Sequence, residues 1–139
     1  MPLTLTILTP DRKILADQSC HQVELPGLGG IFGVLAGHTP LVTPLAIGEI
    51  RTLSGESAVE RRFAVANGFV EVTPEKVTVT AQAAEAADQI DVARAEAAIR
   101  RAEKRLRQQH QEDIDAARAQ AALARALNRL KLAEAVKQA

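Results

Sequence analysis

The chain has 139 residues, with 17 Lys and Arg against 17 Asp and Glu, 47% hydrophobic residues and 2% aromatic residues. A net charge of zero and so few aromatic rings exclude the usual basic, base-stacking surfaces, so we expect no nucleic-acid binding. One cysteine and three scattered histidines predict neither a disulfide framework nor a metal site. No apolar run approaches the roughly 20 residues that span a bilayer, and the N-terminus lacks a signal-peptide pattern. The composition therefore favours a soluble, unprocessed protein of a reducing compartment.

Glycine and proline are distributed unevenly along the chain. All 8 Gly and all 6 Pro precede residue 75, whereas residues 81–139 contain neither and are rich in alanine. We therefore expect two domains of different architecture, residues 1–84 and residues 85–139.

The first domain is predicted to consist of β-strands. From Leu3 the sequence LTLTIL alternates apolar and hydroxyl side chains, which places Leu3, Leu5 and Ile7 on a buried face. Further short runs rich in Val, Ile, Leu and Thr cover residues 13–25, 31–35, 41–53, 58–66, 68–73 and 76–80.

Turn signals separate these strands. Residues 9–13 and 73–76 each contain a proline suited to a tight turn, and Asn67-Gly68 is the pair that a type I′ hairpin prefers. Many short strands at this spacing predict an antiparallel sandwich or a barrel.

The second domain is predicted to form two helices. Asp88 followed by Asp91 resembles a capping box, so we expect the first helix to begin near Asp88 or Gln89. The polar stretch QQHQED interrupts the apolar pattern, and the second helix should run from about Ile114 to about Val136. A short polar connection makes the helices antiparallel neighbours.

The expected contact between these helices is rich in alanine. Its predicted members are Ala95, Ile99, Ala102 and Leu106 on the first helix and Ala116, Ala119, Leu123, Leu127 and Leu130 on the second. Burying a leucine contributes roughly 1.5–3 kcal/mol and a methyl group far less, so this contact should be weak. Two interpretations remain open: a hairpin that can exchange its packing for another partner, and a hairpin docked permanently on the first domain.

Six arginines form two stripes on the predicted helices. The first helix carries Arg94, Arg101 and Arg105, and the second carries Arg118, Arg125 and Arg129 at the same spacing. At 100° per residue each triplet spans about 40° of arc. The stripes could hold an anion such as phosphate or meet an acidic surface, or they could be ordinary solvated helix faces.

No catalytic site is predicted. The glycine-rich segment at residues 27–33 lacks the Gly-Lys-Ser/Thr of a phosphate-binding loop, and His38 is expected to be a structural histidine of a turn. No nucleophile stands beside a suitable base and orienting acid.

Several motifs together resemble one protein family. LTPD at 8–11, LPGLGGIFGVLAGHTPLVTPLAIGEIR at 25–51, ANGFVEV at 66–72 and VTVTAQAAE at 77–85 are similar to the epsilon subunit of the F-type, rotary ATP synthase of bacteria. The similarity continues through IDVARA and ALNRLKLAE, and so covers essentially the whole chain.

The resemblance implies a fold and a role. The fold would be a β-sandwich of two five-stranded sheets followed by an antiparallel two-helix hairpin. The role would be that of a non-catalytic central-stalk subunit, peripheral to the cytoplasmic face of the bacterial plasma membrane, in a complex that couples proton translocation to ATP synthesis. The sandwich would bind the gamma subunit and the c ring. The helices would extend along gamma and inhibit ATP hydrolysis, with their basic faces against an acidic loop of the beta subunit.

The resemblance also implies a regulatory ATP site in the folded hairpin, with no required cofactor. The family signature for ATP is matched by Ile90, Asp91, Arg94 and Ala95, the upstream acid by Glu85, and further positive positions by Arg101, Arg125 and Arg129. Asp91 and Arg94 are one helical turn apart, so they could also form a simple ion pair.

The predicted rotor contact departs from the family pattern. Relatives often carry glutamates in the loop that here reads Leu28-Gly29-Gly30-Ile31, so a c-ring contact through Ile31 would be more apolar or shifted. We assign Ile31 and His38 as rotor contacts on this resemblance. The alternative function is a stand-alone β-sandwich binding module with a helical dimerisation tail.

Overall fold

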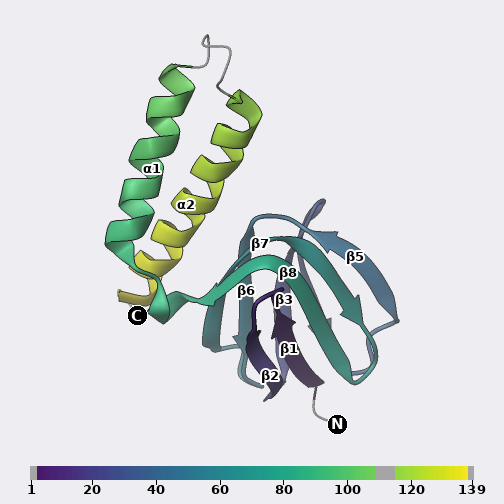
Figure 1. Ribbon diagram of the computed structural model, residues 1–139. Coiled ribbons are helices and arrows are strands. Elements are labelled where there is room, and N and C mark those ends of the chain that lie inside the picture. Colours follow the sequence, from purple (N-terminus) through teal and green to yellow (C-terminus); the bar gives the residue numbers. More distant parts are fainter. Residues whose placement is uncertain (1–2, 109–114, 138–139) are drawn as a thin grey trace. The chain divides into compact units, whose positions relative to one another are not determined.

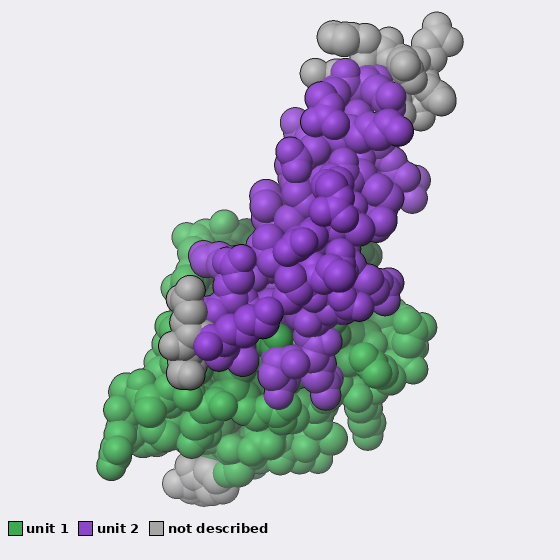
Figure 2. All heavy atoms as spheres, turned by 90° about the vertical axis from the view of Figure 1, so that its left-hand side faces the viewer, with its two compact units in different colours: residues 1–87 green, residues 88–139 purple. Residues whose placement is uncertain are grey.

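The computed structural model describes residues 3–108 and 115–137. The chain divides into two compact units, residues 1–87 and residues 88–139 (Figure 2). The division follows the end of the last strand, at Ala86, and lies three residues beyond the boundary expected from composition.

The first unit contains eight strands (Figure 1). They are β1 (Leu3–Leu8), β2 (Lys13–Cys20), β3 (Gln22–Gly27), β4 (Gly30–Leu35), β5 (Leu41–Leu45), β6 (Gly48–Leu53), β7 (Val59–Val72) and β8 (Lys76–Ala86). The hydrogen-bonded order is β2-β1-β8-β7-β5-β3-β4, and β6 pairs with β3 and β7. The β1–β8 pair is parallel, and the other pairs are antiparallel.

Two long strands connect the parts of this sheet. The first half of β7 pairs with β6 and its last residues pair with β5, while β8 runs beside β7 for most of its length and also pairs with β1. All eight strands therefore belong to one hydrogen-bonded network. The expectation of two five-stranded sheets is not confirmed, because β7 pairs with β5, β6 and β8, and β8 also pairs with β1, which links the strands into this one network.

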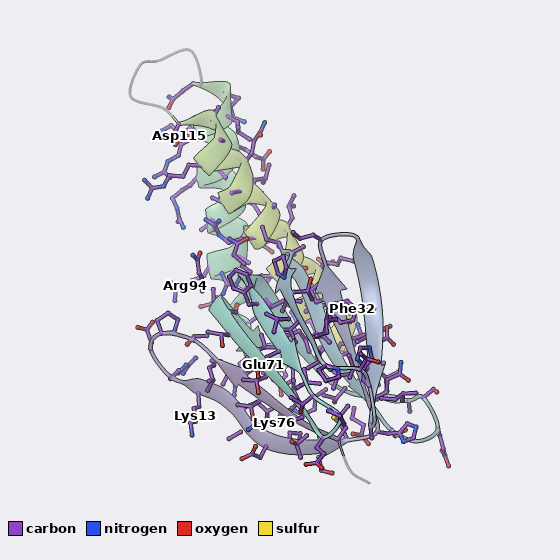
Figure 3. The ribbon with its side chains drawn as sticks, turned by 90° about the vertical axis from the view of Figure 1, so that its right-hand side faces the viewer. Lys13, Phe32, Glu71, Lys76, Arg94 and Asp115 are labelled. Carbon is purple, nitrogen blue, oxygen red and sulfur yellow. The ribbon has the colours of Figure 1, made fainter. Side chains whose placement is uncertain are left out.

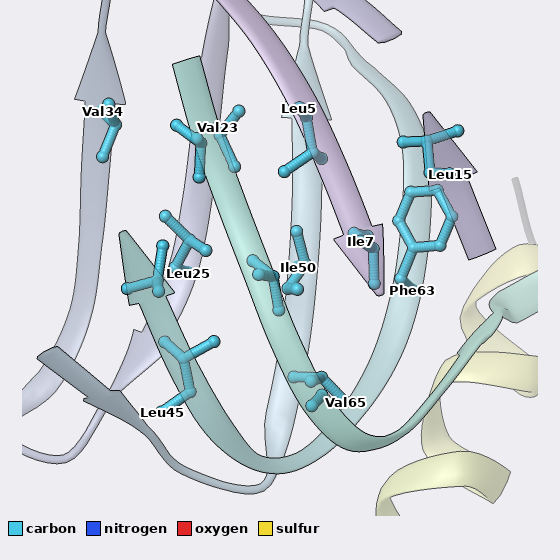
Figure 4. Packing of buried hydrophobic residues seen from close by; sticks show 14 of the residues in the cluster. Leu5, Ile7, Leu15, Val23, Leu25, Val34, Leu45, Ile50, Phe63 and Val65 are labelled. Carbon is cyan, nitrogen blue, oxygen red and sulfur yellow. The ribbon is translucent and has the colours of Figure 1, made fainter. Parts of the chain in front are cut away.

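The core of the sheet is aliphatic (Figure 4). Leu3, Leu5 and Ile7 are at most 1% exposed, which confirms the inward face predicted from their alternation. Phe63 and Ile50 are completely buried in the same cluster.

The two proline-containing turns are confirmed. The Thr9 amide donates to the Arg12 carbonyl between β1 and β2, and the Thr73 amide donates to the Lys76 carbonyl between β7 and β8. In each turn the hydroxyl of the leading threonine also accepts a backbone N–H bond.

The Asn67-Gly68 hairpin prediction is wrong, because β7 continues through both residues. Asn67 does have a positive φ of 53°, but at a bend of the strand and not in a chain reversal. A Cβ atom on Gly68 would lie 2.7 Å from Ala81 Cα and closer still to the Thr80 carbonyl oxygen. Glycine is required here by the close approach of β8, not by a hairpin turn.

The 3₁₀ turn η1 (Ala87–Gln89) crosses the boundary between the units, and the second unit contains two helices, α1 (Val92–Arg107) and α2 (Ala116–Lys137). The first helix begins later than expected near Asp88, because β8 extends to Ala86 and Asp91 is the N-cap residue. The second helix agrees with the prediction to within two residues at each end, although Ile114 and most of the polar connection lie outside the described residues.

Candidate functional site

The contact between the helices is built from alanine. The helices α1 and α2 lie side by side (Figure 1). Their buried residues are Ala95 and Ala102 on α1 and Ala119, Ala126, Leu132 and Ala133 on α2. Three of these alanines, Ala95, Ala102 and Ala119, were predicted.

The position of Leu127 corrects the predicted contact. Leu127 is 49% exposed, whereas its neighbour Ala126 is 3% exposed. The buried alanines of α2 recur at seven-residue intervals, so the helix turns alanine rather than this leucine inward. Small side chains let two helices approach closely, and the larger apolar side chain remains outside.

The N-cap of α1 involves two residues of the predicted nucleotide signature. The Asp91 carboxylate accepts a hydrogen bond from the Arg94 backbone N–H at 3.1 Å. In the described part of the chain, the side chains of these two residues form no ion pair. The Arg94 side chain is exposed at one end of the hairpin and can bind an anion (Figure 3).

Helical geometry places the two arginine stripes on one face of the hairpin. Arg94 and Arg101 each precede a buried alanine of α1 by one residue, and Arg118 and Arg125 do the same on α2. Each stripe therefore lies about 100° from its own buried alanines in the same rotational sense. Two antiparallel helices are exchanged by a two-fold axis perpendicular to the plane that contains both helix axes. Rotation about this axis leaves each side of the plane on the same side. Both arginine stripes therefore lie on one face of the hairpin.

The arginines of this face are accessible to an anion. Arg94, Arg101, Arg105 and Arg118 are exposed, and Arg125 and Arg129 are half-buried. We call these six residues the arginine face. The face includes four of the predicted nucleotide residues, namely Arg94, Arg101, Arg125 and Arg129.

The remaining predicted nucleotide residues occupy other environments. Ile90 is 9% exposed immediately before the N-cap, and Ala95 is completely buried. Glu85 is half-buried in β8, so it belongs to the sandwich unit and not to the hairpin.

Further charged residues lie near Glu85 on the neighbouring strands of the sheet. Glu85 is the register partner of Ala64, and Ala64 is the register partner of Glu49 on β6. Both glutamates therefore lie on one face of the sheet, separated by one alanine. Glu49 binds Arg51 at 3.3 Å and Arg62 at 3.4 Å.

Arg51 extends this ion-pair chain. It binds Glu24 on β3 at 2.8 Å, and this hydrogen bond raises the pKa of the Arg51 guanidinium. This charged network joins residues of β3, β6 and β7 and was not predicted from the sequence.

The two predicted rotor residues lie at opposite ends of β4. Ile31 is 74% exposed near its start. His38 follows its end and is half-buried, with Nδ1 2.6 Å from the Thr39 carbonyl oxygen. The adjacent Gly37 amide donates to the Pro74 carbonyl, which fixes this segment against the β7–β8 turn. The structure does not bring Ile31 and His38 together into one contact surface.

An exposed apolar surface on β5 and β7 was missed by the sequence analysis. Val42 is 70% exposed and Phe69 is 61% exposed. Their register partners are the exposed residues Glu71 and Pro44, so all four side chains lie on the same outer face. We call these residues the β5–β7 face. Their positions alternate with the buried Leu45, Val70 and Val72, a signal that was available in the sequence.

Both domains match known families in order. Residues 2–87 match the family described as ATP synthase, Delta/Epsilon chain, beta-sandwich domain, and residues 88–134 match its long alpha-helix domain. The chain belongs to the ATP synthase delta/epsilon chain family. This confirms the resemblance indicated by the motifs and the sandwich-plus-helices architecture.

Proteins named ATP synthase epsilon chain are similar to most of this chain. The protein of Koribacter versatilis is 50% identical over 101 residues, which cover 72% of this chain and 68% of the relative. The protein of Symbiobacterium thermophilum is 47% identical over 105 residues, covering 76% of this chain and 74% of the relative.

Solved structures share the fold of the delta/epsilon chain. A chain of the Euglena gracilis mitochondrial ATP synthase aligns with a TM-score of 0.76 at 23% identity, covering 98% of this chain and 81% of that one. A chain from the Tetrahymena thermophila mitochondrial ATP synthase central stalk and c ring aligns with a TM-score of 0.56 at 12% identity, covering 98% and 96% of the two chains. No described helix is long and apolar enough to cross a bilayer.

Proposed function

We propose that the chain is the epsilon subunit of an F-type ATP synthase, located in the central stalk that turns inside the catalytic subunits. It is a non-catalytic subunit. The complex would couple proton translocation to ATP synthesis, with this chain peripheral to the cytoplasmic face of a bacterial plasma membrane. The match of both domains to the delta/epsilon chain family, and the 50% identity over 101 residues to a protein named ATP synthase epsilon chain, support this role.

The sandwich would anchor the chain to the rotor. The β5–β7 face combines two exposed apolar side chains with one carboxylate, Glu71, that has no ion pair with another described residue. Such a surface suits a partner that offers apolar residues and a basic group. We assign it to the gamma subunit. The c ring would contact the sandwich at Ile31, through an apolar contact in place of the glutamates of many relatives, and His38 would make a separate rotor contact.

The hairpin would regulate ATP hydrolysis. The observation that carries this proposal is the combination of an arginine face with an alanine contact between the helices. A weak contact lets the helices separate at low cost in free energy. Six arginines then provide a surface that complements an acidic segment of the beta subunit. Extension of the hairpin would inhibit hydrolysis.

ATP would favour the folded hairpin. Arg94, Arg101, Arg125 and Arg129 would bind the phosphates, with Asp91 holding the start of α1 and Ile90 and Ala95 packing beneath it. On the family resemblance, Glu85 is also assigned to ATP binding. A ligand that binds only the closed hairpin stabilises it by about 2.7 kcal/mol at a hundredfold excess over Kd, enough to offset a weak helix contact.

The proposal is tested by adding the full chain to an ATP synthase complex from the same source that lacks it. We expect the chain to co-purify with gamma and to lower ATP hydrolysis. The triple variant Arg118→Ala, Arg125→Ala, Arg129→Ala should still co-purify but inhibit less, whereas Phe69→Asp should lose co-purification.

The rival function predicts a different result. A stand-alone binding module with a helical dimerisation tail would not co-purify with the complex, and would form a dimer that dissociates when α2 is altered. Hydrolysis that is insensitive to the added chain, despite co-purification, would contradict the regulatory part alone.

A further inference from the structure

The strand β4 is an edge of the sheet with one side unpaired. Among the described strands it pairs only with β3, at the end of the hydrogen-bonded order, and the register has no shift. Its sequence, GIFGVL, contains no charged residue and no proline. Ile31 is 74% exposed and Leu35 is 49% exposed. An exposed, apolar and regular edge is a template for pairing with another strand.

The opposite edge of the sheet, β2, is protected against such pairing. It carries Lys13 and Asp17, and the φ of Asp17 is +47°, outside the extended conformation. The register between β1 and β2 also shifts twice. Charges and an irregular backbone are common means by which a sheet edge avoids a new partner, and β4 has neither between Ile31 and Leu35.

The backbone groups that point away from β3 belong to alternate residues of β4. The Pro26 carbonyl on β3 accepts a hydrogen bond from the Ala46 amide, which follows β5 on the other side of β3. Pro26 and Ile31 are register partners, and this is therefore a non-hydrogen-bonded pair. Because the two kinds of pair alternate along antiparallel strands, Ile31, Gly33 and Leu35 direct their N–H and C=O groups to the open side.

These outward residues form a self-complementary pattern. A second, antiparallel copy of β4 centred on Gly33 places the two Gly33 residues opposite each other, and Ile31 opposite Leu35 of the second copy. Both partners in each of these pairs direct their backbone groups outward, so all are hydrogen-bonded pairs. Phe32 faces Val34 of the second copy in the pairs between them. A shift by one residue would leave the outward groups of each copy without partners.

We infer that two copies of this chain form a dimer by antiparallel pairing of their β4 strands, about a two-fold axis at Gly33. The same patch serves both subunits, so the contact closes with two copies and does not continue into a filament. The Leu35 carbonyl already accepts from the His38 amide. The bonds of the dimer are therefore those between the two Gly33 residues and those from each Leu35 N–H to the opposite Ile31 carbonyl.

The charges near the pairing do not oppose it. Glu24 is the only charged residue of β3 and β4, and it is the register partner of Gly33. Its carboxylate binds Arg51 at 2.8 Å. In the dimer the two Glu24 residues would be three strand spacings apart, about 14 Å, so their repulsion would be small.

The dimer would occupy Ile31, which the proposed function assigns to the c ring. One Ile31 side chain cannot make both contacts, so the dimer would be a form of the free chain that separates on assembly. The pairing itself does not depend on that assignment, because it rests on the geometry of β4 alone.

The test uses a matched pair of lysine variants, Ile31→Lys and Leu28→Lys. Both positions are exposed, 74% at Ile31 and 69% at Leu28, but Leu28 lies in the turn before β4. A lysine at position 31 places a charge opposite Leu35 of the second copy, twice in each dimer. Sedimentation equilibrium of the full-length chain should show a dimer for the wild type and Leu28→Lys. The dissociation constant of Ile31→Lys should be about tenfold higher.

The double variant Ile31→Lys, Leu35→Glu tests the register of the pairing. In the two-fold dimer each new lysine lies opposite a new glutamate of the second copy. Within one chain the two positions are about 13 Å apart along an extended strand, too far for an ion pair. The double variant should therefore dimerise more tightly than Ile31→Lys or Leu35→Glu alone, and should lose this gain at high salt.

The outcomes decide the proposal independently of the function proposed above. A monomeric wild type at every concentration, a dimer that Ile31→Lys does not weaken, or an equal effect of Leu28→Lys would overturn the β4 dimer. A double variant that dimerises no more tightly than the single variants would overturn the register at Gly33. Circular dichroism in the β-sheet region verifies that each variant keeps the folded sandwich, as expected for substitutions at exposed positions.

Discussion

The sandwich and the hairpin bury side chains of very different size. The sandwich buries Leu5, Ile7 and Phe63 completely, in a cluster that also includes many valines. The hairpin buries Ala95, Ala102, Ala119, Ala126 and Ala133, with Leu132 as its only large buried side chain among the described helix residues. The number of buried methylene groups per residue therefore differs greatly between the two units.

This difference in buried side chains indicates which unit can change its contacts. Each buried methylene contributes roughly 0.8 kcal/mol, so opening the sandwich has a large cost and separating two alanine-lined helices has a small one. The helices themselves depend on local propensity and N-caps, which survive separation. A stable anchor and an exchangeable arm are thus combined in one chain.

The largest expected effect comes from truncating the sandwich core. Phe63→Ala should lower the free energy of unfolding by about 3–5 kcal/mol, because it removes a completely buried ring. It also removes the cation–π contact with Arg61, whose guanidinium carbon lies 4.9 Å from the ring centroid. The measurement is urea unfolding followed by NMR signals of strand amides.

Phe69→Ala is the matched control on the same strand. Phe69 is 61% exposed, so its loss should change stability by no more than about 0.5 kcal/mol. An equal decrease in the free energy of unfolding of the two variants would contradict this prediction, since it would show that burial does not determine the stability of the sandwich.

A smaller effect is expected from enlarging the hairpin contact. Ala126→Leu places three extra carbon atoms at a position that is 3% exposed, and should cost about 1–3 kcal/mol against closure of the hairpin. Leucine has a helix propensity close to that of alanine, so the helices should persist. Spin labels at the exposed Lys104 and Gln120 would report the helix separation, and circular dichroism the helix content.

Ala124→Leu controls for the added leucine. Ala124 is exposed on the same helix, so its substitution should leave the label distance unchanged. If Ala126→Leu keeps the wild-type label distance, the contact between the helices can accommodate a leucine. The contact is then not closely packed.

The elements that were predicted correctly are those determined by neighbours in sequence. The inward face of Leu3, Leu5 and Ile7 follows from strand periodicity, and the turn at residues 73–76 follows from Pro74. The arginine stripes were also found correctly, because spacing along a helix fixes which residues share a face. Sequence spacing alone does not show that the two stripes share one face of the hairpin. That result also depends on the antiparallel pairing of the helices and on which alanines are buried.

The elements that were missed depend on contacts distant in sequence. Asn67-Gly68 has the composition of a hairpin, but the approach of Thr80 and Ala81 on β8 makes it the bend of a continuous strand. The pairing of Phe63 with Ala86 keeps β8 extended to the point where a helix was expected to start. Glu85 lies in a strand for the same reason.

The smallest expected effect is electrostatic and belongs to the sandwich. The Asp17 carboxylate lies 3.2 Å from Lys76 Nζ and accepts a hydrogen bond from the Thr6 hydroxyl, and these partners, Lys76 first, lower its pKa. A carboxyl whose pKa is lower in the folded state adds stability above its unfolded pKa of about 3.9, and that stability disappears as the pH falls through the folded value.

Asp17→Asn tests this pH dependence. Asparagine tolerates the positive φ of 47° at this position, so the substitution removes the charge without straining the backbone. The difference in urea midpoint between wild type and variant should be small at pH 7, because the carboxylate is exposed, and should vanish near pH 2. Asp11→Asn, in the exposed β1–β2 turn, is the control without an ion pair to another described residue. A midpoint difference that persists unchanged at pH 2 would mean that Asp17 acts through its shape and not its charge, and the β1–β2–β8 edge would then owe its stability to backbone pairing and apolar burial alone.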